Sequence, residues 1–400
     1  MRAKLRMMSF RKVEAPILAA VFLDLLGFGM IIADIQLRAE SMVPHGWPTG
    51  LIVGCLLAST FITQLIVSPR WGSYSDQKGR KAVVVGCTLI SAVAMLTYGL
   101  AGSIWILLLS RILSGFGAAN VAVAQALISD MYGPEQRTAA LGRIGAALSA
   151  GLVVGPSVGG FLAASGGNLL VGFVAGTASL IGAVWMLLAL PNPRPKEAKE
   201  RKKIVGLNLG LLRDLPKLKP LVVIAVVAWL SLATLEGTFA RLISHLFRYD
   251  QREFGVIFGY ESILGVAVQG LLLAWIVTKF RPTNLLRGAY LTQGVGLALN
   301  PFAGLLMPAV APFVLLIVAS TLYAIGSSIS NPTVNGLCSQ LAPDSRQGEL
   351  FGLLQGARSF GFVVGPLVGG VLFDWHPAAP YLLAGAVCVG AAFLVPRIDP

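Results

Sequence analysis

The sequence has few charged residues for its length. Asp, Glu, Lys and Arg together make up 12% of the 400 residues, and histidine occurs only three times. A soluble protein of this size needs more charge to cover its exterior. Hydrophobic residues instead make up 56% of the chain, and the mean hydropathy is +0.77. The scarcity of charge therefore argues against a soluble globular protein and indicates that the lipid bilayer is the solvent.

Cysteine is scarce as well, and its positions form no pattern. The four cysteines lie singly in or at the ends of apolar runs, without CxxC spacing or a nearby histidine cluster: Cys55, Cys87, Cys338 and Cys388. We interpret them as packing residues rather than redox or metal-binding residues. The sequences HExxH and GxxxxGKS/T are also absent, which argues against a zinc hydrolase and against an ATP-driven pump. We therefore expect no enzymatic activity, no cofactor and no metal ion.

Long apolar runs, in contrast, are abundant. A helix needs about 20 apolar residues to cross roughly 30 Å of hydrocarbon. The first run contains Asp24 and Asp34 and lacks a small-residue cleavage site, so we interpret it as a spanning helix and not a signal peptide. The predicted fold is an all-α integral membrane protein with twelve transmembrane helices. The expected spans are 16–37, 49–69, 82–102, 104–130, 138–164, 168–190, 220–243, 253–277, 284–306, 310–335, 348–373 and 378–396.

Positive charge is concentrated in alternate loops. With twelve spans, both termini and the basic segments 70–81 and 191–220 fall on one side of the membrane, and few arginines fall on the other. Because Lys and Arg in short loops resist translocation, both termini are predicted to be cytoplasmic. The net charge of +13 is explained by this topology and by anionic lipid, so we expect no nucleic-acid partner.

Two phrases occur twice in the chain. "GLVVGPSVGG" at 151–160 returns as "GFVVGPLVGG" at 361–370, and "PEQRTAALGR" at 134–143 is echoed by "PDSRQGELFG" at 343–352. The prolines and mixed charge of 191–220 exclude a spanning helix there and suit an exposed connector. We therefore predict two pseudo-symmetric six-helix bundles, residues 1–190 and 221–400, joined by a cytoplasmic linker at 191–220.

The first copy of the glycine phrase predicts a close helix contact. Gly151, Gly155 and Gly159 recur every four residues and share one helix face, where another backbone can approach. Pro156 adds a kink because it cannot donate to the carbonyl of Leu152, and Gly160 extends the small-residue surface. Ordinary packing is one interpretation, and a smooth contact between the halves that slides during transport is the other.

Ionisable residues inside the first bundle are candidates for proton chemistry. Asp24 lies about 12 Å into its span, Asp34 lies about 15 Å further along, and Arg111 falls between them in depth. Desolvation favours the protonated form of a carboxylate, whereas a nearby guanidinium favours the ionised form. A carboxylate that moves between two such environments can take up and release a proton. The alternative is a static pair that fixes two helices against each other.

Other polar residues within the spans suggest a substrate cavity. Glu261 and Arg358 are expected near the membrane midplane of the second bundle, where they either contact substrate or form a structural salt bridge. We also expect Gln64, Asn120 and Gln125 to supply polar lining in the first bundle.

The segment "GSYSDQKGRK" at 72–81 carries a family resemblance. Gly72, Asp76, Gly79, Arg80 and Lys81 match the G-x-x-x-D-R/K-x-G-R/K-R/K pattern of the major facilitator superfamily. "RILSGFGAA" at 111–119 and the glycine phrase resemble two further motifs of that family, and the match is most similar to its drug:proton antiporters. The second-half counterpart, "AWIVTKFRPT" at 274–283, has Thr278 at the aspartate position.

The resemblance implies a gate at the cytoplasmic side. In the family, residues at the positions of Asp76 and Arg80 form a charged latch, and Asp130 is a plausible partner for Arg80 here. Partly exposed ion pairs contribute only about 0–1 kcal/mol each, which suits a latch that must open. The alternative interpretation is a topology signal made of positive charge alone.

Together these features predict a secondary active transporter. The leading hypothesis is a monomeric proton-coupled antiporter in a bacterial inner membrane, which exports small amphipathic or cationic compounds by alternating access. Its expected partners are the small-molecule substrate, protons and the bilayer. An exporter or uniporter of a sugar or metabolite with the same fold is the alternative. A receptor or membrane enzyme is disfavoured because, apart from the linker, the segments outside the spans are short.

Overall fold

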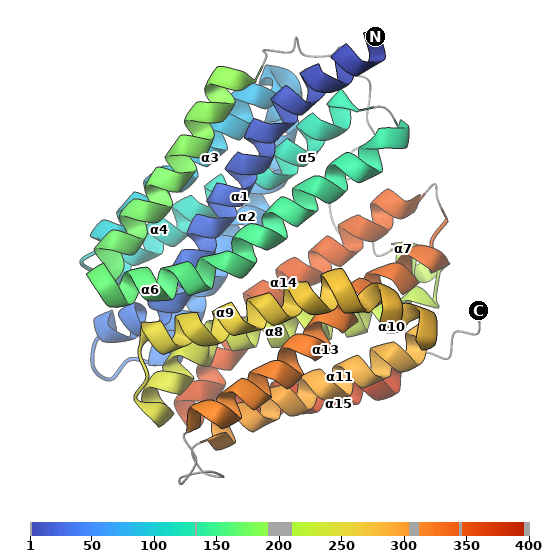
Figure 1. Cartoon of the computed structure of the whole chain (residues 1–400). Helices are drawn as coiled ribbons and strands as arrows, with labels where there is room; N and C mark the ends of the chain where they lie inside the picture. The colour runs from blue at the N-terminus through green and yellow to red at the C-terminus, as the bar shows by residue number, and fades with distance from the viewer. Residues whose placement is uncertain (1, 133, 191–209, 304–311, 344–345, 396–400) are drawn as a thin grey trace. The chain divides into compact units, whose positions relative to one another are not determined.

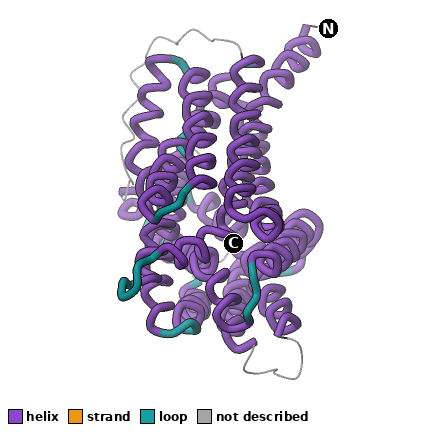
Figure 2. Tube along the Cα trace, turned by 90° about the vertical axis from the view of Figure 1, so that its left-hand side faces the viewer, coloured by secondary structure: helices purple, strands orange, loops and turns teal. Residues whose placement is uncertain are grey.

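The computed structural model describes residues 2–132, 134–190, 210–303, 312–343 and 346–395. In these ranges the regular elements are all helices, and short loops connect them (Figure 2). No strand occurs in the described residues. The all-α expectation is thus confirmed for this part of the chain.

Contacts divide the chain into two compact units. Unit 1 comprises Met1–Met42 and Ser59–Lys203, and unit 2 comprises Val43–Ala58 and Ile204–Pro400. One boundary, between residues 203 and 204, lies inside the expected linker at 191–220, whereas residues 43–58 of the expected first bundle group with unit 2. Residues 191–209 of that linker lie outside the described residues, and its remainder contains the short helix α7 (Gly210–Asp214).

Helices α1 to α6 account for most of the first half of the chain (Figure 1). They are α1 (Arg2–Met42), α2 (Thr49–Lys78), α3 (Arg80–Leu100), α4 (Ile104–Gly117), α5 (Asn120–Met131) and α6 (Pro134–Ala189). Helix α2 begins in unit 2 and ends in unit 1. A buried core that includes Ile17, Val84, Ala124 and Ile144 joins α1, α3, α5 and α6.

Helix α6 contains a reversal at Gly167. This residue has φ 65° and ψ −169°, a conformation that glycine adopts readily and other residues do not. The segments on either side of it both pack along α1, because a Cβ at Gly155 would lie 2.7 Å from Cα of Gly29 and one at Gly27 would lie 3.3 Å from Cβ of Ala175. The element therefore holds the two spans expected at 138–164 and 168–190.

The second half of the chain follows α7 with further helices. They are α8 (Leu218–Phe247), α9 (Gln251–Ala267), η1 (Val268–Leu272), α10 (Leu273–Lys279), α11 (Pro282–Leu299), η2 (Asn300–Phe302), α13 (Pro312–Leu341), α14 (Gln347–Trp375) and α15 (Ala379–Leu394). The π-helical turn η1 interrupts the expected span 253–277. In unit 2, α14 packs against α8, and α11 packs against both α13 and α15.

The two copies of the glycine phrase occupy equivalent places. A Cβ at Gly151 would lie 2.6 Å from the carbonyl oxygen of Phe22, so the first copy approaches the backbone of α1. In the second copy, a Cβ at Gly365 would lie 3.0 Å from the carbonyl oxygen of Leu230 in α8. Each copy thus packs on the first long helix of its own half, and the described contacts of the first copy lie within unit 1.

Nine helices in the described ranges are long and apolar enough to cross a membrane. One of them, Ala140–Ala189, contains the reversal at Gly167. The expected spans 284–306 and 378–396 correspond to α11 and to the shorter helix α15. Large apolar side chains such as Leu188, Trp375 and Phe393 are exposed on the helices, as hydrocarbon contact requires.

Candidate functional site

Asp24 lies in a cluster of neutral hydrogen-bond donors inside unit 1. Its carboxylate accepts from Asn120 Nδ2 at 2.8 Å, from Ser179 Oγ at 2.9 Å and from Ser91 Oγ at 3.3 Å. These donors come from α5, α6 and α3, and Asp24 itself is 4% exposed. Asn120 Nδ2 also contacts Thr88 Oγ1 at 3.3 Å. The α1 carboxylate is therefore buried where four helices meet, and these three hydrogen-bond partners are all uncharged.

Asp34 lies in a second cluster, ten residues further along α1. It accepts a short hydrogen bond from the hydroxyl of Tyr98 in α3. The guanidinium carbons of Arg38 and Arg111 lie 4.8 Å and 5.1 Å from the centroid of the same ring. All four side chains are buried, with 6% exposure or less. The structure thus brings Asp34 and Arg111 to the same aromatic side chain, whereas Asp24 accepts its hydrogen bonds from Asn120, Ser179 and Ser91 in the first cluster.

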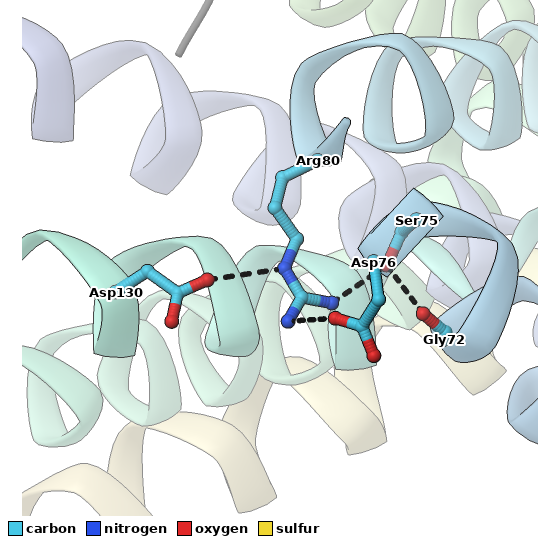
Figure 3. Close-up of polar contacts among 5 residues, drawn as sticks. All are labelled: Gly72, Ser75, Asp76, Arg80 and Asp130. Atoms are coloured by element: carbon cyan, nitrogen blue, oxygen red, sulfur yellow. Dashed lines mark hydrogen bonds and ion pairs between the residues drawn. The ribbon is translucent and has the colours of Figure 1, made fainter. Parts of the chain in front are cut away.

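Arg80 is the centre of a charged cluster at the junction of α2 and α3 (Figure 3). It forms an ion pair with Asp76, and its Nε lies 3.2 Å from Oδ2 of Asp130 at the end of α5. Its Nη1 donates to Ser75 Oγ at 2.6 Å, and that hydroxyl donates to the carbonyl oxygen of Gly72 at 2.7 Å. One guanidinium therefore connects the end of α2 to the end of α5.

Local sequence explains how Arg80 reaches this position. Gly79 has φ 102° and ψ 138°, a region that favours glycine, and it ends α2 and starts α3. Its N–H donates to the carbonyl oxygen of Ser75 at 3.1 Å. The next residue, Lys81, donates from Nζ to the carbonyl oxygen of Leu190 at 2.5 Å, near the end of α6. The tight turn therefore directs two successive basic side chains to different helices of unit 1.

Unit 2 contains its own group of ionisable side chains. Arg358 in α14 lies over the rings of Trp229 and Phe362, with centroid distances of 5.0 Å and 5.7 Å, and its charge acts on Glu236 in α8. Glu261 in α9 lies near Ser320 in α13. The two acids and Arg358 are partly exposed, in contrast to the buried acids of unit 1. The electrostatic partner of Arg358 is thus Glu236, where the sequence suggested Glu261.

The other expected polar residues have different surroundings. Gln64 donates from Nε2 to the carbonyl oxygen of Ala118 at 3.2 Å and is partly buried. Gln125 is exposed, whereas Asn120 is 1% exposed and belongs to the Asp24 cluster. Pro156 and Gly160 are buried along α6 with the other members of the glycine phrase.

Sequence reasoning missed several of these partners. Ser91 and Ser179 are single hydroxyls in apolar helices, and Tyr98 is one aromatic residue among many. Glu14 was missed too: it is 4% exposed and accepts from Arg143 Nε at 2.6 Å and from the Tyr132 hydroxyl at 2.7 Å. The available signal was polarity inside an apolar span, which marks candidates without pairing them.

Comparison with known proteins assigns this chain to a family. The family model described as Major Facilitator Superfamily matches residues 17–310 and 294–400. Multidrug resistance protein 1 of Bacillus subtilis (strain 168) is 28% identical over 382 residues, which is 95% of this chain and 94% of that protein. Quinolone resistance protein NorA of Staphylococcus aureus (strain MSSA476) is 24% identical over 376 residues, covering 94% and 93% of the two chains.

Solved structures support the fold. The nucleoside transporter NupG aligns with a TM-score of 0.74 at 15% identity, covering 95% of this chain and 97% of that one. The human organic anion transporter MFSD10 (TETRAN) aligns with a TM-score of 0.68 at 18% identity, covering 96% and 99%. The fold, the helical membrane spans and the family model agree, and the chain belongs to the Major Facilitator Superfamily as a multi-pass membrane transporter.

Proposed function

We propose that this chain is a proton-coupled exporter of small amphipathic or cationic compounds. The observation that carries the proposal is the Asp24 cluster, a buried carboxylate surrounded by Asn120, Ser91 and Ser179. A carboxylate at membrane depth is costly when ionised, and neutral donors offset that cost only in part. Such a group can exist protonated in one conformation and ionised in another. The names of the relatives, which are drug-resistance proteins, favour export as the direction.

Asp34 and Arg111 form the second candidate for proton coupling. Both contact Tyr98, and both are buried inside unit 1. A change in the charge of Asp34 therefore acts on the Tyr98 side chain, over whose ring the guanidinium of Arg111 lies. We propose Asp24 as the first candidate for the acid that exchanges protons and Asp34 as the second.

The charged cluster at Arg80 is proposed to act as a cytoplasmic gate. Its two acidic partners, Asp76 and Asp130, are partly exposed, with side-chain exposures of 50% and 32%. Pairs of this kind contribute about 0–1 kcal/mol each, so the cluster can form and break within a transport cycle. In the same model, the glycine surfaces of α6 and α14 let their helices shift against α1 and α8.

Substrate contacts are proposed for exposed and partly exposed polar residues. Glu261 and Arg358 supply one negative and one positive group in unit 2, and Gln64 and Gln125 supply amides in unit 1. We include Asn120 among these residues because it donates a hydrogen bond to Asp24. Competition between a cationic substrate and a proton for nearby acids is the simplest form of coupling.

We further propose that the protein works as a monomer in a bacterial inner membrane, with both termini and the 191–220 linker in the cytoplasm. Charge asymmetry between the loops supports this orientation. Single cysteines at His45 and Glu200, in a background without the native cysteines, test it. An impermeant maleimide added outside should label position 45 and not position 200; labelling of position 200 contradicts the orientation.

Transport itself is tested in liposomes that contain the purified protein. An imposed pH gradient should drive ethidium, a fluorescent organic cation, against its concentration gradient. Dissipating the pH gradient with a protonophore should stop this uphill movement. Ethidium transport that ignores the pH gradient would assign the chain to uniport instead.

A further inference from the structure

Tyr98 connects a buried acid to a buried arginine. Its side chain lies at the end of α3 and is 0% exposed. The hydroxyl donates to Asp34 in α1, and the ring lies beneath the guanidinium of Arg111 in α4, 5.1 Å from its centroid. The charges that act on Tyr98 are those of Asp34, Arg38 and Arg111. One aromatic side chain thus contacts both charged groups proposed for the second coupling site.

Arg38 has a structural role in this cluster. Its guanidinium donates to the carbonyl oxygens of Tyr98 at 2.5 Å and Gly99 at 3.4 Å, and also to that of Ala101. These carbonyls belong to the last turn of α3, where the helix dipole favours a cation. Arg38 therefore caps α3 and holds the Tyr98 backbone in place.

Arg111 is held differently. Its Nε donates to Ser110 Oγ at 3.3 Å, and its buried Nη2 has no hydrogen-bond partner among the described residues. A buried guanidinium without a full set of acceptors is costly, so its contact with the Tyr98 ring is a major part of its stabilisation. A change in the electron density on the face of that ring therefore changes the stabilisation of Arg111.

We propose that Tyr98 is a positioning residue that transmits the protonation state of Asp34 to Arg111. The inference rests on the proposed proton-coupled function. An ionised Asp34 polarises the phenol through a charge-assisted hydrogen bond and adds electron density to the ring, which strengthens the cation–π contact. Protonation of Asp34 weakens that hydrogen bond and with it the hold on Arg111. The arginine is then released to make other contacts in the cycle.

Tyr98→Phe tests the hydroxyl while it keeps the ring. Without the hydroxyl, the ionised form of Asp34 loses a donor, so protonation takes place at higher pH. The pH of half-maximal ethidium transport in liposomes should rise by roughly one unit. Tyr290→Phe is the matched control, because Tyr290 is also 0% exposed and its hydroxyl donates at 2.8 Å to the uncharged carbonyl of Ile224. This control should keep the wild-type pH profile.

Thermal unfolding in detergent provides a second readout that needs no transport activity. Tyr98→Phe should lose more stability at high pH, where Asp34 is ionised, than at low pH. Tyr290→Phe should lose the same amount at every pH. The Tyr98→Phe effect on the pH profile should also vanish in an Asp34→Asn background, since no titrating carboxylate remains there.

The outcomes separate the two proposals. A wild-type protein that is driven by the pH gradient, together with a Tyr98→Phe variant whose pH profile and pH-dependent stability match those of Tyr290→Phe, overturns the role of Tyr98 alone. A wild-type protein that ignores the gradient overturns the proposed function, and the inference falls with it.

Discussion

Asn120 donates a hydrogen bond of 2.8 Å to the carboxylate of Asp24, and this bond joins α5 to α1. Asn120→Ala should lower the free energy of unfolding by about 1–3 kcal/mol, because hydrogen bonds to charged groups are among the stronger ones. Thr97→Val is the control, since that hydroxyl donates an exposed hydrogen bond within its own helix, to the carbonyl oxygen of Val93. Equal melting temperatures for the two variants in detergent would show that the Asp24 cluster contributes no stability.

The close contact made by the glycine phrase can be tested with two variants in one helix. Gly155→Ala adds a methyl group 2.7 Å from Cα of Gly29, so the contact between α6 and α1 must open. Overpacking of this kind costs typically about 1–3 kcal/mol. Gly145→Ala, in the same helix with nothing within 4 Å of the added methyl, should be neutral or slightly stabilising.

The same comparison applies to the second copy of the phrase. Gly365→Ala brings a methyl group to 2.8 Å from Cβ of Ala233 in α8, whereas Gly352→Ala meets open space. Melting temperatures should therefore fall for Gly155→Ala and Gly365→Ala and not for the two controls. If all four variants melt alike, the glycine faces are not required for helix contact.

The Arg80 cluster predicts an effect on local opening. Arg80→Lys keeps the charge but loses the planar fork that reaches Ser75, Asp76 and Asp130 together. Hydrogen exchange of a peptide that covers 72–81 should become faster, and the rate of ethidium efflux should change with it. Lys78→Gln, at an exposed position of the same segment, should leave exchange unchanged. Unchanged exchange in Arg80→Lys would leave only the interpretation as a topology signal.

Much of the fold follows from composition and spacing. Long apolar runs predict membrane helices because hydrocarbon leaves the backbone no other way to satisfy its hydrogen bonds. The spacing of Gly151, Gly155 and Gly159 predicts a close approach, because residues four apart share a helix face. Neither feature tells which helix is the neighbour, since many helices present small residues. Packing on α1 and α8 therefore had to come from the structure.

Partners of the buried acids were harder to predict than the acids. Asp24 and Asp34 stand out because a carboxylate inside a span is rare. Ser91, Ser179 and Tyr98 are common residues in apolar helices, and their roles depend on rotation and depth of helices far apart in the chain. The sequence placed Arg111 between the two acids in depth, but only the structure brings it to Tyr98 beside Asp34.

The most direct test of proton coupling is to measure proton release when substrate binds. Purified protein in weakly buffered detergent solution is mixed with ethidium while the pH is recorded. The proposed function predicts release of about one proton per ethidium bound, and binding that tightens with rising pH over the range where the acid titrates. Release should be lost in Asp24→Asn or, if the second site carries the proton, in Asp34→Asn. Binding of ethidium without proton release at any pH between about 5 and 9 would contradict the account.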